Sequence, residues 1–154
     1  MLTGVEYANM DAKGRVPVPA RLRAALMERC DGDIVITTSL NSPCLVIYPI
    51  EEWRKLEQQF LTMPSLNPKV SASQRLLMGY ANAIKLDASG RILVSKSLRE
   101  RAVLEKETAF VGQVNRIEVW HKEAWDKEVV RSLQVLQSSG DDLPMELASL
   151  TGIS

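Results

Sequence analysis

A five-residue pattern occurs twice in the chain, and this internal repeat limits the folds that the sequence can adopt. Segment 11–15 reads DAKGR and segment 87–91 reads DASGR, 76 positions later in a chain of 154 residues. A repeat of this kind predicts two tandem copies of one structural unit. The flanking residues keep the same register: Met10 with Leu86, Val16 with Ile92, Val18 with Val94, Leu22 with Leu98, and Arg23 with Arg99.

Each copy of the pattern predicts a tight turn between two strands. Asp at the first position and Gly at the fourth suit a type I turn, in which the Asp side chain accepts backbone N–H groups and Gly takes a positive φ. Residue types alternate on either side of the turn, so we expect each repeat to open as a β-hairpin with Asp and Arg at its tip. Pro17 and Pro19 lack N–H donors, so we expect the second strand to lie at a sheet edge or to end early.

The arginine after each glycine, Arg15 or Arg91, points to a function. A carboxylate four residues earlier, Asp11 or Asp87, can hold the guanidinium in one orientation. A pre-oriented arginine suits bidentate contact with phosphate or with the O6/N7 edge of guanine. The alternative is that each Asp–Arg pair only stiffens its own hairpin. The recurrence of the pair in two basic segments favours binding.

Charge is distributed unevenly in a chain whose formal net charge is zero. Residues 1–23 carry four basic and two acidic side chains, and residues 85–101 carry five and two. The repeats are therefore the basic parts of the chain, and the local field decides whether a surface attracts nucleic acid. This modest excess predicts weak binding by one subunit, so that useful affinity needs several subunits acting together.

Composition and motifs exclude several other classes of protein. A hydrophobic content of 45% without a membrane-spanning run or a cleavable leader predicts a cytoplasmic globular protein. Cys30 and Cys44 match no metal-binding spacing and are expected to be reduced thiols. His121 is the only histidine, and no nucleophile, zinc or phosphate-loop motif is present. We therefore expect no enzyme activity, no catalytic residue, no metal and no cofactor.

Periodicity and turn signals predict strands and helices along both halves. The expected strands after the first hairpin span 34–38, 44–48, 80–86, 91–95, 108–113 and 117–121. The expected helices begin at Pro19 and end before Asp31, and span 50–61, 68–78, 96–102 and 122–137. The last helix should place Trp125, Val129, Leu133 and Leu136 on one apolar face.

These motifs resemble the bacterial MraZ family. The doubled Asp-x-x-x-Arg pattern carries the resemblance, together with 45–49 (LVIYP) followed by Trp53, and with 74–79 (QRLLMG) before the second pattern. The resemblance implies an α+β fold, in which two tandem AbrB-like swapped-hairpin units close into one pseudo-twofold, double-psi-like β-barrel with flanking helices. It divides the chain into a first repeat with its helix (1–62), a connector and helix (63–79), a second repeat with a C-terminal helix (80–137) and an acidic, flexible tail (138–154).

The same resemblance implies a function and its residues. MraZ proteins are transcriptional regulators that bind short direct repeats in double-stranded DNA ahead of the division and cell-wall gene cluster, including their own promoter. They form homo-oligomeric rings, octamers or dodecamers. Because such regulators bind DNA, the chain is expected in the cytoplasm at the nucleoid and not at a membrane. Carried over by position, the DNA-binding residues are Arg15, Lys13, Asp11, Arg91 and Asp87.

The two repeats differ in ways that bear on this role. Ser89 replaces Lys13 and Ser97 replaces Arg21, so the second tip is less basic and the first copy is expected to make the main DNA contact. Two other functions stay open. One is a MazE-like antitoxin that binds a toxin through its tail, and the other is a ring-forming scaffold without a nucleic-acid ligand.

Overall fold

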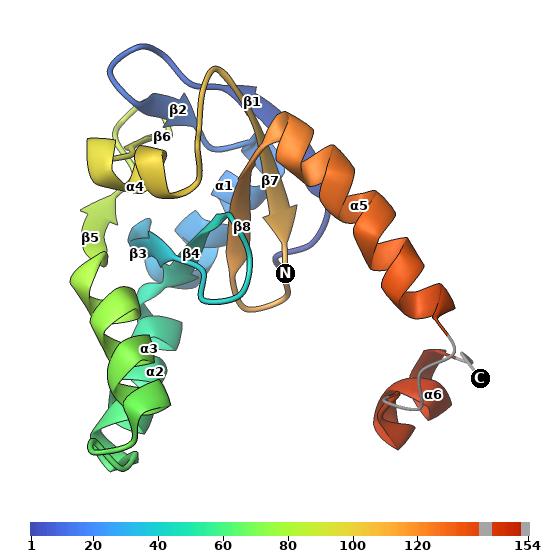
Figure 1. Cartoon of the computed structure of the whole chain (residues 1–154). Coiled ribbons are helices and arrows are strands. Elements are labelled where there is room, and N and C mark those ends of the chain that lie inside the picture. The colour runs from blue at the N-terminus through green and yellow to red at the C-terminus, as the bar shows by residue number, and fades with distance from the viewer. Residues whose placement is uncertain (139–142, 152–154) are drawn as a thin grey trace.

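The computed structural model describes residues 1–138 and 143–151, and these form a mixed α+β fold (Figure 1). The described strands are β1 (Val5–Asn9), β2 (Arg15–Pro17), β3 (Asp33–Thr38), β4 (Leu45–Pro49), β5 (Asn82–Lys85), β6 (Arg91–Leu93), β7 (Glu107–Gly112) and β8 (Ile117–His121). The described helices are α1 (Ala20–Cys30), α2 (Ile50–Thr62), α3 (Pro68–Gly79), α4 (Lys96–Arg101), α5 (Lys122–Gln137) and α6 (Met145–Thr151). Within these ranges, no helix combines the length and the apolar content needed to cross a membrane.

The large sheet interleaves strands from the two repeats. Its order is β1-β7-β8-β4-β3-β5, and every pairing is antiparallel. The first strand of each repeat, β1 or β5, pairs with a strand of the other repeat, β7 or β3 respectively. In the two repeats, β1 corresponds to β5, β3 to β7 and β4 to β8. If each strand is replaced by its counterpart, the sheet order reads the same from the opposite edge. The sheet is therefore organised about a pseudo-twofold axis.

The remaining strand of each repeat, β2 or β6, leaves the large sheet. The two pair with each other as a separate antiparallel ribbon. The expectation that the strands flanking each turn pair as a hairpin is therefore wrong, although the turn itself forms. Since β2 is three residues long and contains Pro17, which lacks an N–H, it is poorly suited to extend a ladder with β1.

The expected single closed barrel also needs correction. Among the described residues, β1 and β5 end the six-stranded sheet without pairing to each other, and the ribbon does not join them through a strand ladder. The strands that would have continued the sheet are used in the ribbon instead. What holds the two layers together is apolar packing rather than continuous backbone pairing.

One core lies between the sheet, the ribbon and the short helices. Val16 and Ile92, which face each other across the ribbon, are almost completely buried in it. The core draws on both repeats, and burial of this apolar surface at about 25 cal/mol per Å² stabilises the two halves as one unit. Its other fully buried side chains include Leu22, Leu98, Ile36 and Phe110.

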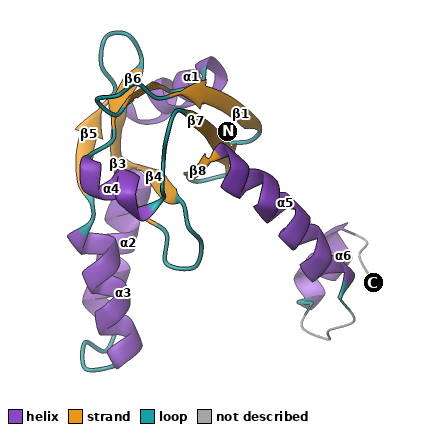
Figure 2. Ribbon diagram, turned by 45° about the horizontal axis from the view of Figure 1, so that its top comes forward, coloured by secondary structure: helices purple, strands orange, loops and turns teal. Residues whose placement is uncertain are grey.

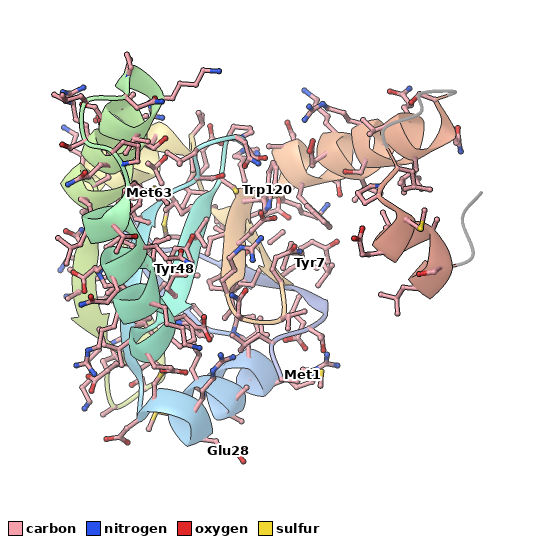
Figure 3. All side chains as sticks on the ribbon, turned by 90° about the horizontal axis from the view of Figure 1, so that it is seen from below. Met1, Tyr7, Glu28, Tyr48, Met63 and Trp120 are labelled. Carbon is pink, nitrogen blue, oxygen red and sulfur yellow. The ribbon has the colours of Figure 1, made fainter. Side chains whose placement is uncertain are left out.

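Each repeat places an aromatic pair where its last strand meets the helix that follows. Tyr48 and Trp53 have ring centroids 5.7 Å apart, and Trp120 and Trp125 have the same separation. Figure 3 shows Tyr48 beside α2 and Trp120 near the start of α5. The two pairs lie 72 residues apart in the sequence, so the structural repeat extends beyond the turns.

Side chains and backbone conformation at the helix ends explain where the helices begin and end. The Asn67 side chain accepts hydrogen bonds from the backbone N–H groups of Lys69 and Val70 and caps α3. Ser95 caps α4 through the N–H of Leu98. Asp31, in the left-handed conformation, ends α1. Helices α2 and α3 extend together away from the sheet, and α5 extends from it separately (Figure 2).

The apolar face of α5 is exposed beyond its first turns. Trp125 packs against a small cluster around Trp120, but Val129, Leu133 and Leu136 are 38%, 52% and 52% exposed. Periodicity identified an apolar stripe without showing what lies against it. Within the tail that was predicted to be flexible, 138–154, the structure has helix α6, and residues 139–142 and 152–154 lie outside the described residues.

Candidate functional site

The first turn is held by one carboxylate oxygen. Asp11 Oδ1 accepts hydrogen bonds from the backbone N–H groups of Lys13 and Arg15, both at 2.9 Å. The backbone closes the turn as well, because Gly14 N–H donates to the Asp11 carbonyl at 3.1 Å and Asp11 N–H donates to the Arg15 carbonyl at 2.8 Å. Gly14 has φ +93°, which confirms the predicted need for glycine.

The second turn repeats this geometry. Asp87 Oδ1 accepts from the N–H groups of Ser89 at 2.9 Å and Arg91 at 2.8 Å. Gly90 N–H donates to the Asp87 carbonyl at 2.9 Å, and Gly90 has φ +74°. The two turns therefore present their fifth residue with the same local backbone.

These hydrogen bonds favour ionised aspartates. The backbone N–H of Arg15 is the largest cause that lowers the pKa of Asp11 below its ordinary value of 3.8. For Asp87, the backbone N–H of Arg91 has the same leading effect on the pKa, and the Arg91 side chain adds to it. Both turns thus carry a fixed negative charge at neutral pH.

The two arginine side chains are held differently. Arg91 Nε donates to Asp87 Oδ2 at 3.0 Å, which is the tethering that the spacing predicts. In the first turn, within the described part of the chain, Asp11 receives only backbone N–H groups and makes no hydrogen bond or ion pair with the Arg15 guanidinium. The predicted side-chain tether is therefore wrong for Arg15, although the charge of Arg15 still contributes to lowering the Asp11 pKa.

The ribbon brings both arginines to one surface. Arg15 lies opposite Leu93, and Pro17 lies opposite Arg91. Directly opposed residues and residues two apart point to the same side of an antiparallel pair, so these four share one face. Val16 and Ile92 point to the other side, into the core. We call Arg15, Pro17, Arg91 and Leu93 the ribbon face.

Two members of the ribbon face were not predicted as site residues. Leu93 is 53% exposed and Pro17 is exposed, so two apolar side chains share this face with the two arginines. The signal was available, because each stands two residues after an arginine on the same strand. It was missed because the sequence gives no indication that β2 and β6 pair with each other.

The other predicted site residues lie around this face. Lys13 is exposed at the apex of the first turn, and its counterpart Ser89 is exposed at the second. Arg21, which contributes to the basic character of the first segment, donates to the Thr3 carbonyl at 3.0 Å and is used in fixing the N-terminal segment. The first turn therefore keeps Lys13 and Arg15 as its basic side chains.

Residues set aside in the sequence have structural roles. His121 Nδ1 accepts the N–H of Glu123 and caps α5. Burial raises the pKa of Cys44 to about 12, so its thiol stays protonated at neutral pH. In the described ranges, no group of three or more His, Cys, Asp or Glu side chains is placed to hold a metal ion.

Comparison with known proteins gives one consistent family. The family model described as "MraZ protein, putative antitoxin-like" matches the chain twice, over residues 1–76 and 77–139. A protein of Alkalilimnicola ehrlichii named transcriptional regulator MraZ is 45% identical over 98% of this chain and 99% of its own length. Proteins with the same name from Hydrogenovibrio crunogenus and Proteus mirabilis are 40% and 38% identical over at least 96% of each chain.

Proposed function

Because the chain belongs to the MraZ family, we propose that it is a transcriptional regulator that binds double-stranded DNA through the ribbon face. The observation that supports this most is the convergence of Arg15 and Arg91, 76 residues apart in sequence, on one side of a two-stranded ribbon. A ribbon of two strands fits the major groove of B-DNA, where arginine reads guanine through O6 and N7.

The residues of the two turns would make different kinds of contact with DNA. Arg15 and Arg91 would contact base edges, and Lys13 at the first apex would contact a phosphate. Asp87 would pre-orient Arg91 through the 3.0 Å contact, whereas Asp11 would act on Arg15 only through the backbone of the turn. We therefore extend the expected main contact from the first turn to both turns, with Lys13 favouring the first.

Assembly completes the proposal. A chain of zero net charge offers few phosphate contacts per subunit, so specific binding would come from several subunits on successive direct repeats. We propose a homo-oligomeric ring acting in the cytoplasm at the nucleoid, on the division and cell-wall gene cluster and its own promoter. The interleaved sheet supports an interpretation of each repeat as an AbrB-like swapped-hairpin unit.

A gel-shift titration on the DNA upstream of the chain's own gene tests this function. Arg15→Ala and Arg91→Ala are each expected to weaken specific binding about tenfold or more, because a bidentate arginine–guanine contact contributes roughly 1–3 kcal/mol. Lys13→Ala should weaken binding to all sequences and reduce the salt slope by about one.

Arg54→Ala is the matched control, because Arg54 is exposed on α2, away from the ribbon (Figure 1). If the Arg15 and Arg91 variants bind like this control, the ribbon face is not the DNA surface. An assembled wild-type protein that retains no duplex at low salt would instead favour the scaffold alternative.

A further inference from the structure

Each turn is in contact with an arginine from the helix of the other repeat. Arg99, on α4, lies against Gly14: a Cβ built on that glycine would be 3.0 Å from Arg99 Nε and 3.2 Å from its Cζ. Arg23, on α1, lies against Gly90 in the same way, with its Nε 3.0 Å from the corresponding Cβ position. The two arginines occupy equivalent positions of the repeat, 76 residues apart.

Backbone hydrogen bonds reinforce these contacts. Val94 N–H donates to the Gly14 carbonyl at 2.8 Å, and Val18 N–H donates to the Gly90 carbonyl at 3.0 Å. Each glycine is therefore held at its carbonyl by one segment of the opposite repeat and covered at its Cα by an arginine from the next helix of that repeat. A side chain on either glycine would displace the arginine.

The Arg99 contact is one of packing rather than charge. Its Nε is buried and has no hydrogen-bond partner among the described residues, an unfavourable arrangement for a polar nitrogen. No carboxylate of the described chain forms an ion pair with Arg99 or Arg23. What both side chains supply is a flat group and a long stem laid on the glycine of the opposite turn.

We propose that Arg99 and Arg23 are positioning residues that set the two DNA-reading turns across the repeat boundary, Arg99 for the first turn and Arg23 for the second. The inference rests on the proposed function for its consequence, but the bracing itself does not depend on DNA. The turn that carries Arg15 is thus positioned by the second repeat, and the turn that carries Arg91 is positioned by the first repeat. Each repeat therefore depends on the other for the position of its DNA-binding arginine.

Hydrogen exchange measured by mass spectrometry on the full-length protein tests the bracing. Arg99→Ala should speed exchange in peptide 10–16 about threefold or more and leave peptide 86–92 unchanged, because local opening raises exchange in the loosened segment. Arg23→Ala should do the reverse. Arg99→Met, which keeps a long stem to cover Gly14, should restore slow exchange in peptide 10–16. Peptide 34–38, in β3, reports whether the fold is intact.

Three outcomes of the exchange experiment would overturn the inference. The first is that each variant loosens the turn of its own repeat. The second is that neither turn changes while β3 stays protected. The third is that Arg99→Met exchanges as fast as Arg99→Ala, because packing would then not be what positions the turn.

DNA binding supplies the second readout. Arg99→Ala should weaken specific binding about tenfold without changing the salt slope, and adding it to Arg15→Ala should cost little more. A salt slope reduced by about one would identify Arg99 as a direct phosphate contact and contradict a positioning role. If exchange responds as expected while wild-type protein retains no DNA, the bracing stands and the proposed function fails. If wild-type protein binds DNA but exchange does not respond to the variants, the proposed function stands and the bracing by Arg99 and Arg23 fails.

Discussion

At the scale of the residue, both aspartates hydrogen-bond to the turn backbone, whereas only one of them, Asp87, also bonds to its arginine side chain among the described residues. The spacing Asp-x-x-x-Arg predicts a side-chain pair, and Asp87 with Arg91 forms one at 3.0 Å. One carboxylate oxygen of Asp11 instead accepts hydrogen bonds from two backbone N–H groups. Residue types and their spacing predicted both turns. The same spacing occurs in both, so it does not show which arginine side chain its aspartate holds.

A pH dependence follows from the Asp11 hydrogen bonds. Since folding lowers the pKa of Asp11, the carboxylate contributes stability that is fully present above its ordinary value of 3.8 and is lost as the pH falls through the folded-state value. We expect Asp11→Asn to be less stable than wild type at neutral pH, with a difference that closes as the pH falls below 3.8. Urea unfolding of both proteins across this range measures it. A difference that stays constant or grows on acidification would contradict the assignment.

At the scale of the element, local sequence predicted which strands and helices form but not which of them pack or pair together. Element types and most boundaries were predictable, because proline, glycine and capping residues mark them locally. The pairing of β2 with β6 was not, because alternation identifies a strand without its partner. The exposed stripe of α5 has the same explanation, since period 3.6 defines a face and not what covers it.

The two turn glycines should respond unequally to alanine. A Cβ on Gly14 would lie 2.5 Å from the Val94 carbonyl oxygen, which belongs to the backbone, whereas the three atoms nearest to a Cβ on Gly90 all belong to the flexible Arg23 side chain. Both positions have positive φ, which disfavours alanine by about 1–2 kcal/mol. Gly14→Ala should therefore lower the free energy of unfolding by roughly 1 kcal/mol or more beyond Gly90→Ala. Denaturant unfolding decides the order, and equal losses would mean that the strand near Val94 can move freely.

At the scale of the whole molecule, two repeats make one fold because neither completes its own sheet. In the described part of the chain, β1 pairs with β7 of the second repeat and with no other strand, and β3 pairs with β5 of that repeat. The internal repeat predicted two tandem copies of one unit, and the family resemblance implied the pseudo-twofold relation that the strand order has. It did not predict an open six-stranded sheet with a separate ribbon, because closure depends on which strands are long enough to continue the ladder.

A chain cut after α3 tests this dependence. The fragment 1–79 retains β1 to β4 but lacks the partners of β1 and β2 and one partner each of β3 and β4, so we expect no cooperative unfolding of a monomer by circular dichroism. Mixing it with fragment 80–154 should restore the wild-type spectrum. A monomeric 1–79 that unfolds cooperatively would show that the repeats are independent domains.

The most direct measurement of the central claim is a methylation footprint of guanine N7 on the upstream DNA. N7 lies in the major groove, where Arg15 and Arg91 of the ribbon face are proposed to bind. We expect wild-type protein to protect one or more guanines in each direct repeat, and Arg15→Ala at a saturating concentration to expose at least one of them. Guanines that remain equally protected in the Arg15→Ala and Arg91→Ala variants, or that are never protected by wild type, would contradict recognition through the ribbon face.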